Sequence, residues 1–227
     1  MRKIGQGWQY TVYDMDNGRV RKQTYSPVLQ YLYILKNNIF NWSIFSEAKK
    51  GMHRVRKMEK ASNDYIQSIL PRLDSGLLGH PTFFTDGYEQ DKSIILGDIL
   101  KKCSLSEGKE IFDSYIELIY NTWRYGFADT VFNFAVNNSL NMDHNVIQID
   151  FGELIFDKSE IEQNIKNKSW LRSASYTMFP EGELKSYYRN LMERKLTLEK
   201  LNKLWKSKLK AHRNSKTTGA RQLNLAE

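Results

Sequence analysis

The sequence predicts an α+β protein in which short strands occur beside long amphipathic helices. An Asn-Gly pair at 17–18 separates two alternating segments, which is the strongest short-range signal for a β-hairpin. Residues 42–70 and 107–124 carry apolar side chains at helical spacing. The segment 182–213 is rich in charge and also has a helical pattern. Together these patterns give a mixed chain with strands mainly at the beginning and helices mainly at the end.

The chain begins with two glycines, Gly5 and Gly7, followed by the predicted hairpin of residues 10–13 and 19–24. The Asn-Gly pair is expected to form a two-residue type I′ turn, because both residues tolerate positive φ. A dinucleotide-binding fingerprint needs a helix directly after its glycines. The predicted strand at that position therefore argues against a Rossmann-type turn.

The middle of the chain is predicted to contain two helices and a group of short strands. Residues 27–35 and 42–70 have apolar residues at helical spacing, and Pro71 ends the second helix. Residues 77–100 are predicted to form short strands around an Asp-Gly pair at 86–87, and they end in an apolar run.

The second half is predicted to be mainly helical, with one more pair of strands. The helix 107–124 precedes strand candidates at 132–136 and 146–149, which a polar loop joins. The segment 182–213 is expected to be helical. The last residues, 215–227, are expected to be disordered.

The composition indicates a globular protein of a reducing compartment. The 227 residues are 41% hydrophobic and include a single cysteine, Cys103. No apolar run reaches the roughly 20 residues that span a bilayer. The N-terminus also lacks the apolar segment of a signal peptide, so a cytoplasmic protein is expected. One thiol and four scattered histidines argue against a zinc site.

The formal charge of +8 is not evenly spread, because lysines and arginines recur between residues 185 and 221. We expect a solvated helix face followed by a basic tail. Contact with nucleic acid, an anionic membrane or an acidic partner protein is the alternative, since such a surface attracts anions.

Three motifs occur in one chain in a set order. They are GQGWQYTV at 5–12, VRK at 20–22, and IDFG at 149–152 after an apolar strand. They resemble the glycine-rich loop, the strand lysine and the Asp-Phe-Gly motif of the protein-kinase-like superfamily, with Tyr10 in the place of the third glycine. Residues 93–100 resemble the strand that leads into the hinge of small atypical bacterial kinase-like proteins of the YrbL type.

The resemblance implies a two-lobed protein-kinase-like fold, with an antiparallel-sheet N-lobe and a reduced helical C-lobe. The N-lobe would comprise residues 1–100. The C-lobe, with the catalytic and Asp-Phe-Gly loops, would comprise 101–213, and a flexible tail 214–227 would follow. The resemblance covers residues 4–155, and too few residues follow for the full helical lobe of a typical protein kinase.

The resemblance also implies ATP and Mg²⁺ as cofactors. Gly5 and Gly7 would let backbone N–H groups approach the phosphates, because no Cβ stands in the way. Val12 would cover the adenine. Lys22 would contact the α- and β-phosphates, and a carboxylate on the following helix would hold its side chain in place.

Two further acidic positions follow from the same resemblance. Glu47 is our prediction for the helix carboxylate, because its apolar neighbours would turn its face inward, and Glu59 on the same helix is the alternative. Asp150 would ligate Mg²⁺, while Phe151 packs beneath it and Gly152 allows the turn.

The catalytic loop departs from the family pattern HRDxxxxN. Neither histidine nor arginine directly precedes Asp129, the carboxylate of this region. We assign Asp129 to orienting the acceptor hydroxyl. We assign Asn133 to the second metal site, because it stands at the start of a predicted strand as the family asparagine does, although it lies one residue nearer to Asp129 than the pattern expects. Asn137 is the alternative, because its spacing to Asp150 suits the family better.

The sequence thus predicts a kinase that transfers the γ-phosphate of ATP to a hydroxyl. A protein Ser/Thr is favoured over a small molecule as acceptor, because the helical part is short and basic. A pseudokinase that binds nucleotide without transfer is the first alternative, since the His-Arg pair is missing. A nucleic-acid-binding protein that acts through its basic C-terminal helix is the second.

Overall fold

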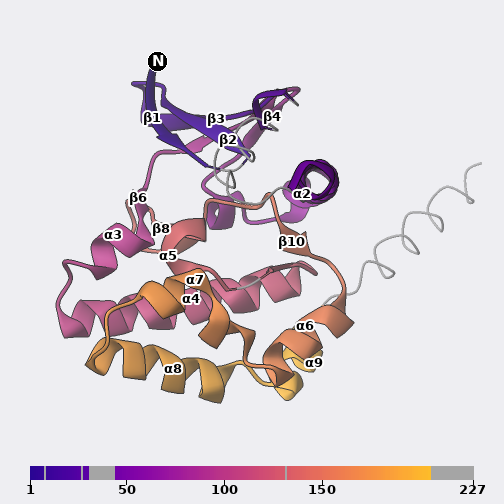
Figure 1. The fold of residues 1–227 in the computed structure, drawn as a ribbon. Helices are drawn as coiled ribbons and strands as arrows, with labels where there is room; N and C mark the ends of the chain where they lie inside the picture. Colours follow the sequence, from indigo (N-terminus) through magenta and orange to yellow (C-terminus); the bar gives the residue numbers. More distant parts are fainter. Residues whose placement is uncertain (8, 27, 31–43, 131, 206–227) are drawn as a thin grey trace, which may run out of the picture.

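The structure is a computed structural model of the chain with an antiparallel sheet at one end and most of its helices at the other (Figure 1). The residues that it describes are 1–7, 9–26, 28–30, 44–130 and 132–205. The side chains of residues 44–51 are outside this description. At this level the predicted α+β class is confirmed.

Five strands form the main sheet, in the spatial order β1-β2-β3-β5-β4. They are β1 (Arg2–Gln6), β2 (Tyr10–Asp14), β3 (Arg19–Thr24), β4 (Thr82–Phe84) and β5 (Gly87–Asp91). All neighbours are antiparallel, and β3 lies at the centre between β2 and β5. The first strand, which contains Gly5, adds to the predicted hairpin.

The hairpin between β2 and β3 is confirmed, but its loop is longer than predicted. The amide of Met15 donates to the carbonyl of Arg19 (3.1 Å) and closes the loop. Positive φ occurs at Asp16 (60°) and Gly18 (78°), and not at Asn17. The two-residue type I′ turn is therefore wrong. The Asn17 side chain instead accepts from the Arg19 amide (3.1 Å), as short polar side chains commonly do in turns.

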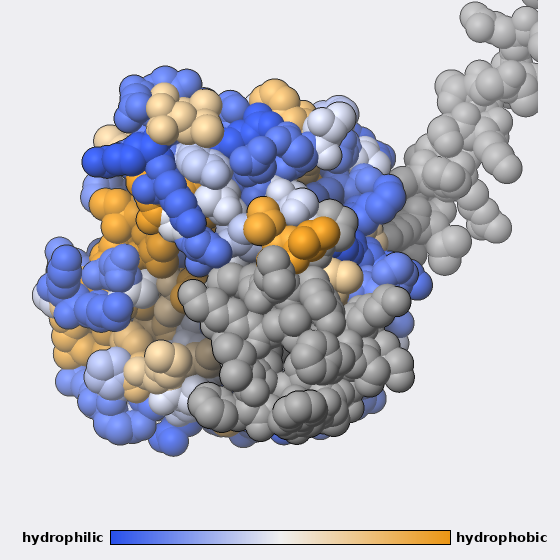
Figure 2. Space-filling view, turned by 45° about the horizontal axis from the view of Figure 1, so that its top comes forward, coloured by the Kyte–Doolittle hydropathy of each residue, from blue (hydrophilic) through white to orange (hydrophobic). Residues whose placement is uncertain are grey.

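Alternation along β3 divides the sheet into two faces. Lys22 lies on the buried face, whereas Arg19 and Arg21 lie on the other. There Arg19 pairs with Asp91 (2.9 Å) and Arg21 with Asp86 (2.5 Å). Hydrophilic side chains cover most of the upper end of the molecule in Figure 2. The charged face can remain in water, so the opposite face is the one that packs on the rest of the protein.

The helix α2 (Ile44–Ile69) lies beside the sheet (Figure 1) and is followed by a 3₁₀ turn, Leu70–Arg72. The position of this helix and its end near Pro71 agree with the sequence pattern, because proline lacks the N–H that would continue the helix. Buried apolar side chains of α2 and of the sheet form one core cluster. The predicted helix 27–35 lies largely outside the described residues.

Residues 94–205 form what we call the helical part, which also contains two small sheets. Its helices are α3 (Leu96–Leu100), α4 (Leu105–Arg124), α5 (Phe134–Asn137), α6 (Lys158–Lys166), α7 (Ala174–Met178), α8 (Glu183–Lys195) and α9 (Leu198–Leu204), with a 3₁₀ turn at Ser169–Arg172. Another 3₁₀ turn, Ser75–Leu78, precedes β4. One small sheet contains β6 (Ile94–Ile95), β8 (Asn138–Leu140) and β9 (Val146–Gln148), and the other pairs β7 (Ala128–Asp129) with β10 (Leu154–Ile155).

The helix α4 supplies much of the core of the helical part; it ends at Arg124 as predicted and begins at Leu105, before the predicted start at 107. Ser104 and Glu107 form a reciprocal capping box, in which the Glu107 carboxylate accepts from the Ser104 amide (2.7 Å). Its buried side chains include Phe112, Tyr115 and Trp123. They pack with side chains of α8. The strand β7 follows shortly after the C-terminal end of α4 in the chain.

The predicted strand 132–136 is wrong, because a left-handed residue and a helical turn take its place. Phe132 has φ 54°, which interrupts an extended segment. Phe134 then begins the short helix α5 and is fully buried, whereas Val136 is 55% exposed. The strand β8 follows in the segment that was expected to be a polar loop.

The predicted helix 182–213 consists of α8 and α9 in its described part. The second helix has its own N-cap, since the Thr197 hydroxyl accepts from the Lys200 amide (3.1 Å). Residues 206–213 and the predicted tail 214–227 lie outside the described residues. Among the helices that the structure describes, none is long and apolar enough to cross a membrane.

Replacing Gly87 by alanine is expected to destabilise the central strand pair. Gly87 has φ 143°, and a Cβ there would lie 1.9 Å from the carbonyl oxygen of Lys22. We expect a loss of about 3 kcal/mol in unfolding free energy, which urea unfolding measures. Gly18→Ala is the matched control, because Gly18 has φ 78° but no atom within 4 Å of the added methyl. The control should lose only about 1 kcal/mol, and equal losses would contradict the close approach.

Candidate functional site

Lys22 is buried on the packed face of the sheet and is only 7% exposed. Its cross-strand neighbours are Val12 and Tyr88. The Nζ of Lys22 donates to the carbonyl oxygen of Ile149 (2.5 Å) and lies 5.4 Å from the centre of the Tyr88 ring. Burial lowers the pKa of Lys22, and the Asp150 carboxylate opposes that change. The predicted lysine is thus in contact with the predicted Asp-Phe-Gly segment.

The segment 149–152 is anchored to Asn137 by two backbone hydrogen bonds. The carbonyl of Asn137 accepts from the amides of Ile149 (2.8 Å) and Asp150 (3.2 Å). The Oδ1 of Asp150 accepts from the amide of Gly152 (3.2 Å), which closes a tight turn. These contacts fix Asp150 just beyond the end of β9.

Phe151 packs this turn onto the sheet. It is fully buried, and its ring stacks on Tyr88 with a centroid distance of 4.4 Å. Tyr88 also donates its hydroxyl to the carbonyl of Ile149 (3.2 Å). Ile66 of α2 belongs to the same buried cluster. The main sheet, α2 and the turn at 149–152 therefore meet in one apolar cluster, and this packing fixes the backbone of the turn that carries Asp150.

The described glutamate of α2 that reaches this region is Glu59, the alternative to Glu47. Glu59 is buried and accepts from the hydroxyl of Thr24 (3.2 Å). Burial raises the pKa of Glu59. The described contacts of the Lys22 ammonium are with Ile149 and Tyr88 and not with a glutamate. The side chain of Glu47 lies outside the described residues, so its pairing with Lys22 stays a prediction.

Asp129 lies between the two candidate asparagines. Its carboxylate accepts from the backbone amide of Asn133 (2.9 Å) and from the side-chain amide of Asn137 (3.3 Å). The side-chain oxygen of Asn133 accepts from the amide of Ser175 (3.1 Å) and from its hydroxyl. Asn137 is therefore the residue that connects Asp129, through its side chain, with Asp150, through its backbone carbonyl.

The side chain of Asn137, and not that of Asn133, contacts Asp129, and the assignment of either asparagine to a metal stays a prediction. The side-chain oxygen of Asn133 is engaged with Ser175 on α7. Asn133 was preferred over Asn137 because a strand was expected to begin there, whereas the helix α5 begins directly after it. The extra helical turn brings Asn137 back to Asp129.

Gln9 connects the glycine segment to the Asp-Phe-Gly turn and was not among the predicted site residues. It is 6% exposed, and a Cβ on Gly152 would lie 2.1 Å from the Gln9 side-chain oxygen. The carbonyl of Gln9 accepts from the amide of Tyr25 (3.1 Å), which fixes its backbone. Its position in the motif carried no signal, because glutamine is an ordinary residue in a polar loop.

The two glycines of the first motif have no described neighbour that would clash with an added Cβ. Gly5 lies in β1 opposite Val12, and Gly7 donates its amide to the carbonyl of Tyr10 (2.9 Å). A Cβ at Gly5 would meet Val12 at 3.6 Å, and a Cβ at Gly7 would meet its nearest atom at 4.0 Å. Neither has positive φ. The contacts of the described chain thus leave room for a side chain at both positions.

The groups of the site that could bind a metal ion offer oxygen atoms as ligands. In the described part of the chain, no group of three or more His, Cys, Asp and Glu side chains could hold a metal ion. Asp150 and Asn137 instead offer one carboxylate and one amide oxygen. Oxygen ligands of this kind, completed by water and phosphate, are what Mg²⁺ uses in phosphate-binding sites.

Comparison with known proteins does not assign the chain to a family. No protein-family model matches the chain, and a search of curated proteins found no match.

Lys22→Met is expected to leave the fold intact and to be as stable as the wild type, or more stable by up to about 2 kcal/mol, at neutral pH. The reason is that methionine fills the site without a buried charge. Because the folded-state pKa of Lys22 is lowered, the unfolded chain binds more protons in the window between that pKa and the ordinary lysine value. Wild-type stability should therefore rise relative to Lys22→Met as the pH rises through this window, as measured by urea unfolding from pH 7 to 10.

Lys60→Met is the control for that comparison, because Lys60 lies on α2 with a side chain 77% exposed. Its stability relative to the wild type should not change over the same pH range. A stability difference between Lys22→Met and the wild type that is constant with pH would contradict the buried lysine.

Proposed function

We propose that this protein binds ATP with Mg²⁺ and transfers the γ-phosphate to a hydroxyl, as a small protein-kinase-like phosphotransferase. The observation that carries the proposal is the buried Lys22, whose ammonium lies against the residue that precedes Asp150. Segments far apart in the sequence thus meet at one place, where the Asp150 carboxylate is near enough to oppose the lowering of the Lys22 pKa. We further propose a two-lobed arrangement, with the nucleotide between the main sheet and the helical part.

The energetics of Lys22 support an anionic ligand. A buried ammonium is costly unless an opposite charge compensates it. Its described partners are a carbonyl and an aromatic ring, and the Asp150 carboxylate only partly opposes the lowered pKa. Perturbed groups of this kind occur preferentially at functional sites. Phosphate oxygens would supply further negative charge, and the backbone of Gly5 and Gly7, which carries no Cβ, would let them approach its N–H groups.

The carboxylates have distinct roles in the proposal. Asp150 and Asn137 would hold Mg²⁺, which when bound neutralises charge on the phosphates. Asp129, held by the Asn137 amide, would accept a hydrogen bond from the acceptor hydroxyl and so aim it. A serine or threonine of a protein is the proposed acceptor, and the proposed location is the cytoplasm.

A nucleotide-binding pseudokinase is the second candidate. The residue two before Asp129 is Phe127, which is fully buried in an apolar cluster where the family pattern has histidine. Gln9 also lies against Gly152 in the space between the glycine segment and the turn. Binding of nucleic acid or another anionic partner would depend on the basic segment 185–221, which the structure describes only as far as residue 205.

ATP with Mg²⁺ is expected to raise the melting temperature of the wild type by about 5–10 °C at a concentration of 100 times Kd. Asp150→Asn should lose the Mg²⁺-dependent part of this shift, and Lys22→Met should lose most of the shift. Lys60→Met is again the matched control and should behave as the wild type. An equal shift in all four proteins would contradict the proposed site.

Transfer of labelled γ-phosphate to the protein itself or to a general protein substrate separates the two candidates. The kinase proposal expects transfer by the wild type that falls at least about 100-fold in Asp150→Asn. Binding without transfer in the wild type would favour the pseudokinase. The absence of both would contradict a nucleotide site.

Asn137→Ala is expected to raise the Mg²⁺ concentration needed for half-maximal nucleotide binding by about 10-fold, because it removes a metal ligand and a partner of Asp129. Asn133→Ala is the comparison, since it removes the contacts with Ser175. It should lower the melting temperature without changing the Mg²⁺ requirement. The reverse pattern, measured by titrating Mg²⁺ at fixed nucleotide, would return the metal site to Asn133.

A further inference from the structure

The short helix α5, which lies between Asp129 and the end of its own turn at Asn137, is capped by a residue from another segment. Asn133 occupies the N-cap position of α5, but in the described structure its side chain makes no capping hydrogen bond. An N-cap side chain normally accepts from the second or third amide of its helix. In α5 the second amide, that of Ala135, donates instead to the hydroxyl oxygen of Ser175 on α7 (2.9 Å).

Ser175 also binds the residue whose capping role it takes. The side-chain oxygen of Asn133 accepts from the backbone amide of Ser175 (3.1 Å) and from its hydroxyl. The hydroxyl of Ser175 is therefore donor and acceptor at once, as a serine hydroxyl can be. Because Ser175 is only 6% exposed, its partners have little access to water as a substitute. The start of α5 is thus fastened to α7 by all three of these hydrogen bonds.

The helix α7 is itself held at both ends. At its start the hydroxyl of Ser173, which is 2% exposed, accepts from the amide of Tyr176 (3.1 Å). At its end the ammonium of Lys185 on α8 donates to the carbonyl of Phe179 (2.9 Å). Ser175 therefore has a fixed position from which it can hold α5.

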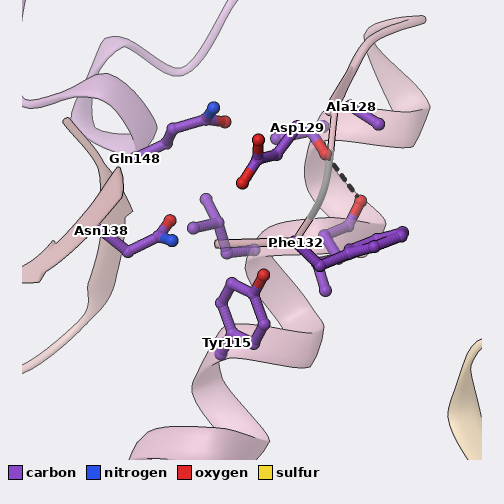
Figure 3. Close-up of a pocket in the computed structure, with 9 residues that line it drawn as sticks. Tyr115, Ala128, Asp129, Phe132, Asn138 and Gln148 are labelled. Atoms are coloured by element: carbon purple, nitrogen blue, oxygen red, sulfur yellow. Dashed lines mark hydrogen bonds between the residues drawn. The ribbon is translucent and has the colours of Figure 1, made fainter. Parts of the chain in front are cut away.

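The start of α5 in turn holds Asp129. The backbone amide of Asn133 donates to the Asp129 carboxylate (2.9 Å), and the side-chain amide of Asn137 approaches it from the end of α5 (3.3 Å). In Figure 3 the Asp129 carboxylate points to the side of Asn138, the residue that directly follows α5. The carboxylate is thus directed toward the segment that Ser175 fastens.

We propose that Ser175 is a positioning residue for Asp129, which it holds through Asn133 by fixing the start of α5. Asn137, at the other end of α5, is also tied by its carbonyl to the amides of Ile149 and Asp150. The end of α5 therefore keeps an anchor that does not depend on Ser175. The hold on Asp129 stands by itself, and only its catalytic consequence rests on the proposed function.

The catalytic consequence is a loss of rate. If Asp129 aims the acceptor hydroxyl, a less constrained carboxylate loses rate and not nucleotide affinity. Ser175→Ala should lower kcat about 10-fold and leave KM for ATP unchanged. The Mg²⁺ concentration needed for half-maximal nucleotide binding should also stay the same, because Asn137 keeps its second anchor.

Ser173→Ala is the matched control, because Ser173 is a buried serine two residues away whose described hydrogen bonds are with Trp170 and Tyr176 and not with the segment 129–137. Both variants should lower the melting temperature by about 2–6 °C, since each loses the contacts of a buried hydroxyl. Only Ser175→Ala should lower kcat.

Backbone amide signals in NMR spectra test the hold on Asp129 without any activity. The Asn133 amide reports on the Asp129 carboxylate, and its signal should shift in Ser175→Ala and not in Ser173→Ala. An unchanged Asn133 signal in Ser175→Ala overturns the proposal.

Hydrogen exchange in the wild type tests the cap even if Ser175→Ala does not fold. The Ala135 amide should exchange at least about 100-fold more slowly than an unprotected amide, because it is bonded to a buried hydroxyl. Exchange at the unprotected rate overturns the cap and with it the proposal.

The two proposals can fail separately. If the wild type transfers no phosphate, the proposed function fails, and the amide signals of Asn133 and Ala135 still decide whether Ser175 holds Asp129. If the wild type transfers phosphate and Ser175→Ala has the kcat of Ser173→Ala, the positioning role is overturned and the proposed function stands.

Discussion

One buried hydrogen bond, from the ammonium of Lys22 to the carbonyl of Ile149, joins the main sheet to the helical part of the chain. Tyr88 shares the same carbonyl and carries Phe151 against its ring, so the polar contact lies inside an apolar cluster. A hydrogen bond to a charged group contributes only about 1.5–3 kcal/mol, less than the cost of removing an ammonium from water. The surrounding apolar packing must supply the difference. The apolar cluster thus holds the Lys22 side chain in a buried position, near Asp150, that an ammonium group would otherwise leave for water.

The residues that could be predicted from the sequence carry local signals. Lys22 stands in an alternating strand after an Asn-Gly loop, and Asp150 follows an apolar strand directly before Phe-Gly. The helix α4 is indicated by the spacing of its apolar residues and by a serine at the position that forms a capping box. Each of these features depends on interactions within a few residues. For the same reason the strand order of the main sheet, which depends on distant pairings, was not specified beyond its antiparallel character.

The choices that the sequence left open, and the one residue that it did not single out, depend on packing between distant segments. Glu47 and Glu59 stand on one helix in similarly charged surroundings, and only the docking of α2 on β3 buries Glu59 beside Thr24. Asn137 reaches Asp129 because the short helix α5 lies between them. The alternating phenylalanines of this segment had instead indicated a strand. Gln9 is distinguished solely by its contact with Gly152, more than a hundred residues away. None of these contacts has a local signature.

The sequence separation of the Lys22–Ile149 contact, 127 residues, bears on the order in which the chain assembles. Closing so long a loop costs more conformational entropy than forming the β2–β3 hairpin or the capped helix α4, and contacts of high sequence separation slow folding. Lys22 can therefore stay hydrated and charged until both ends have formed their own structure. We expect its dehydration to coincide with the docking of Phe151, so that the charge is buried late in folding and exposed early in unfolding.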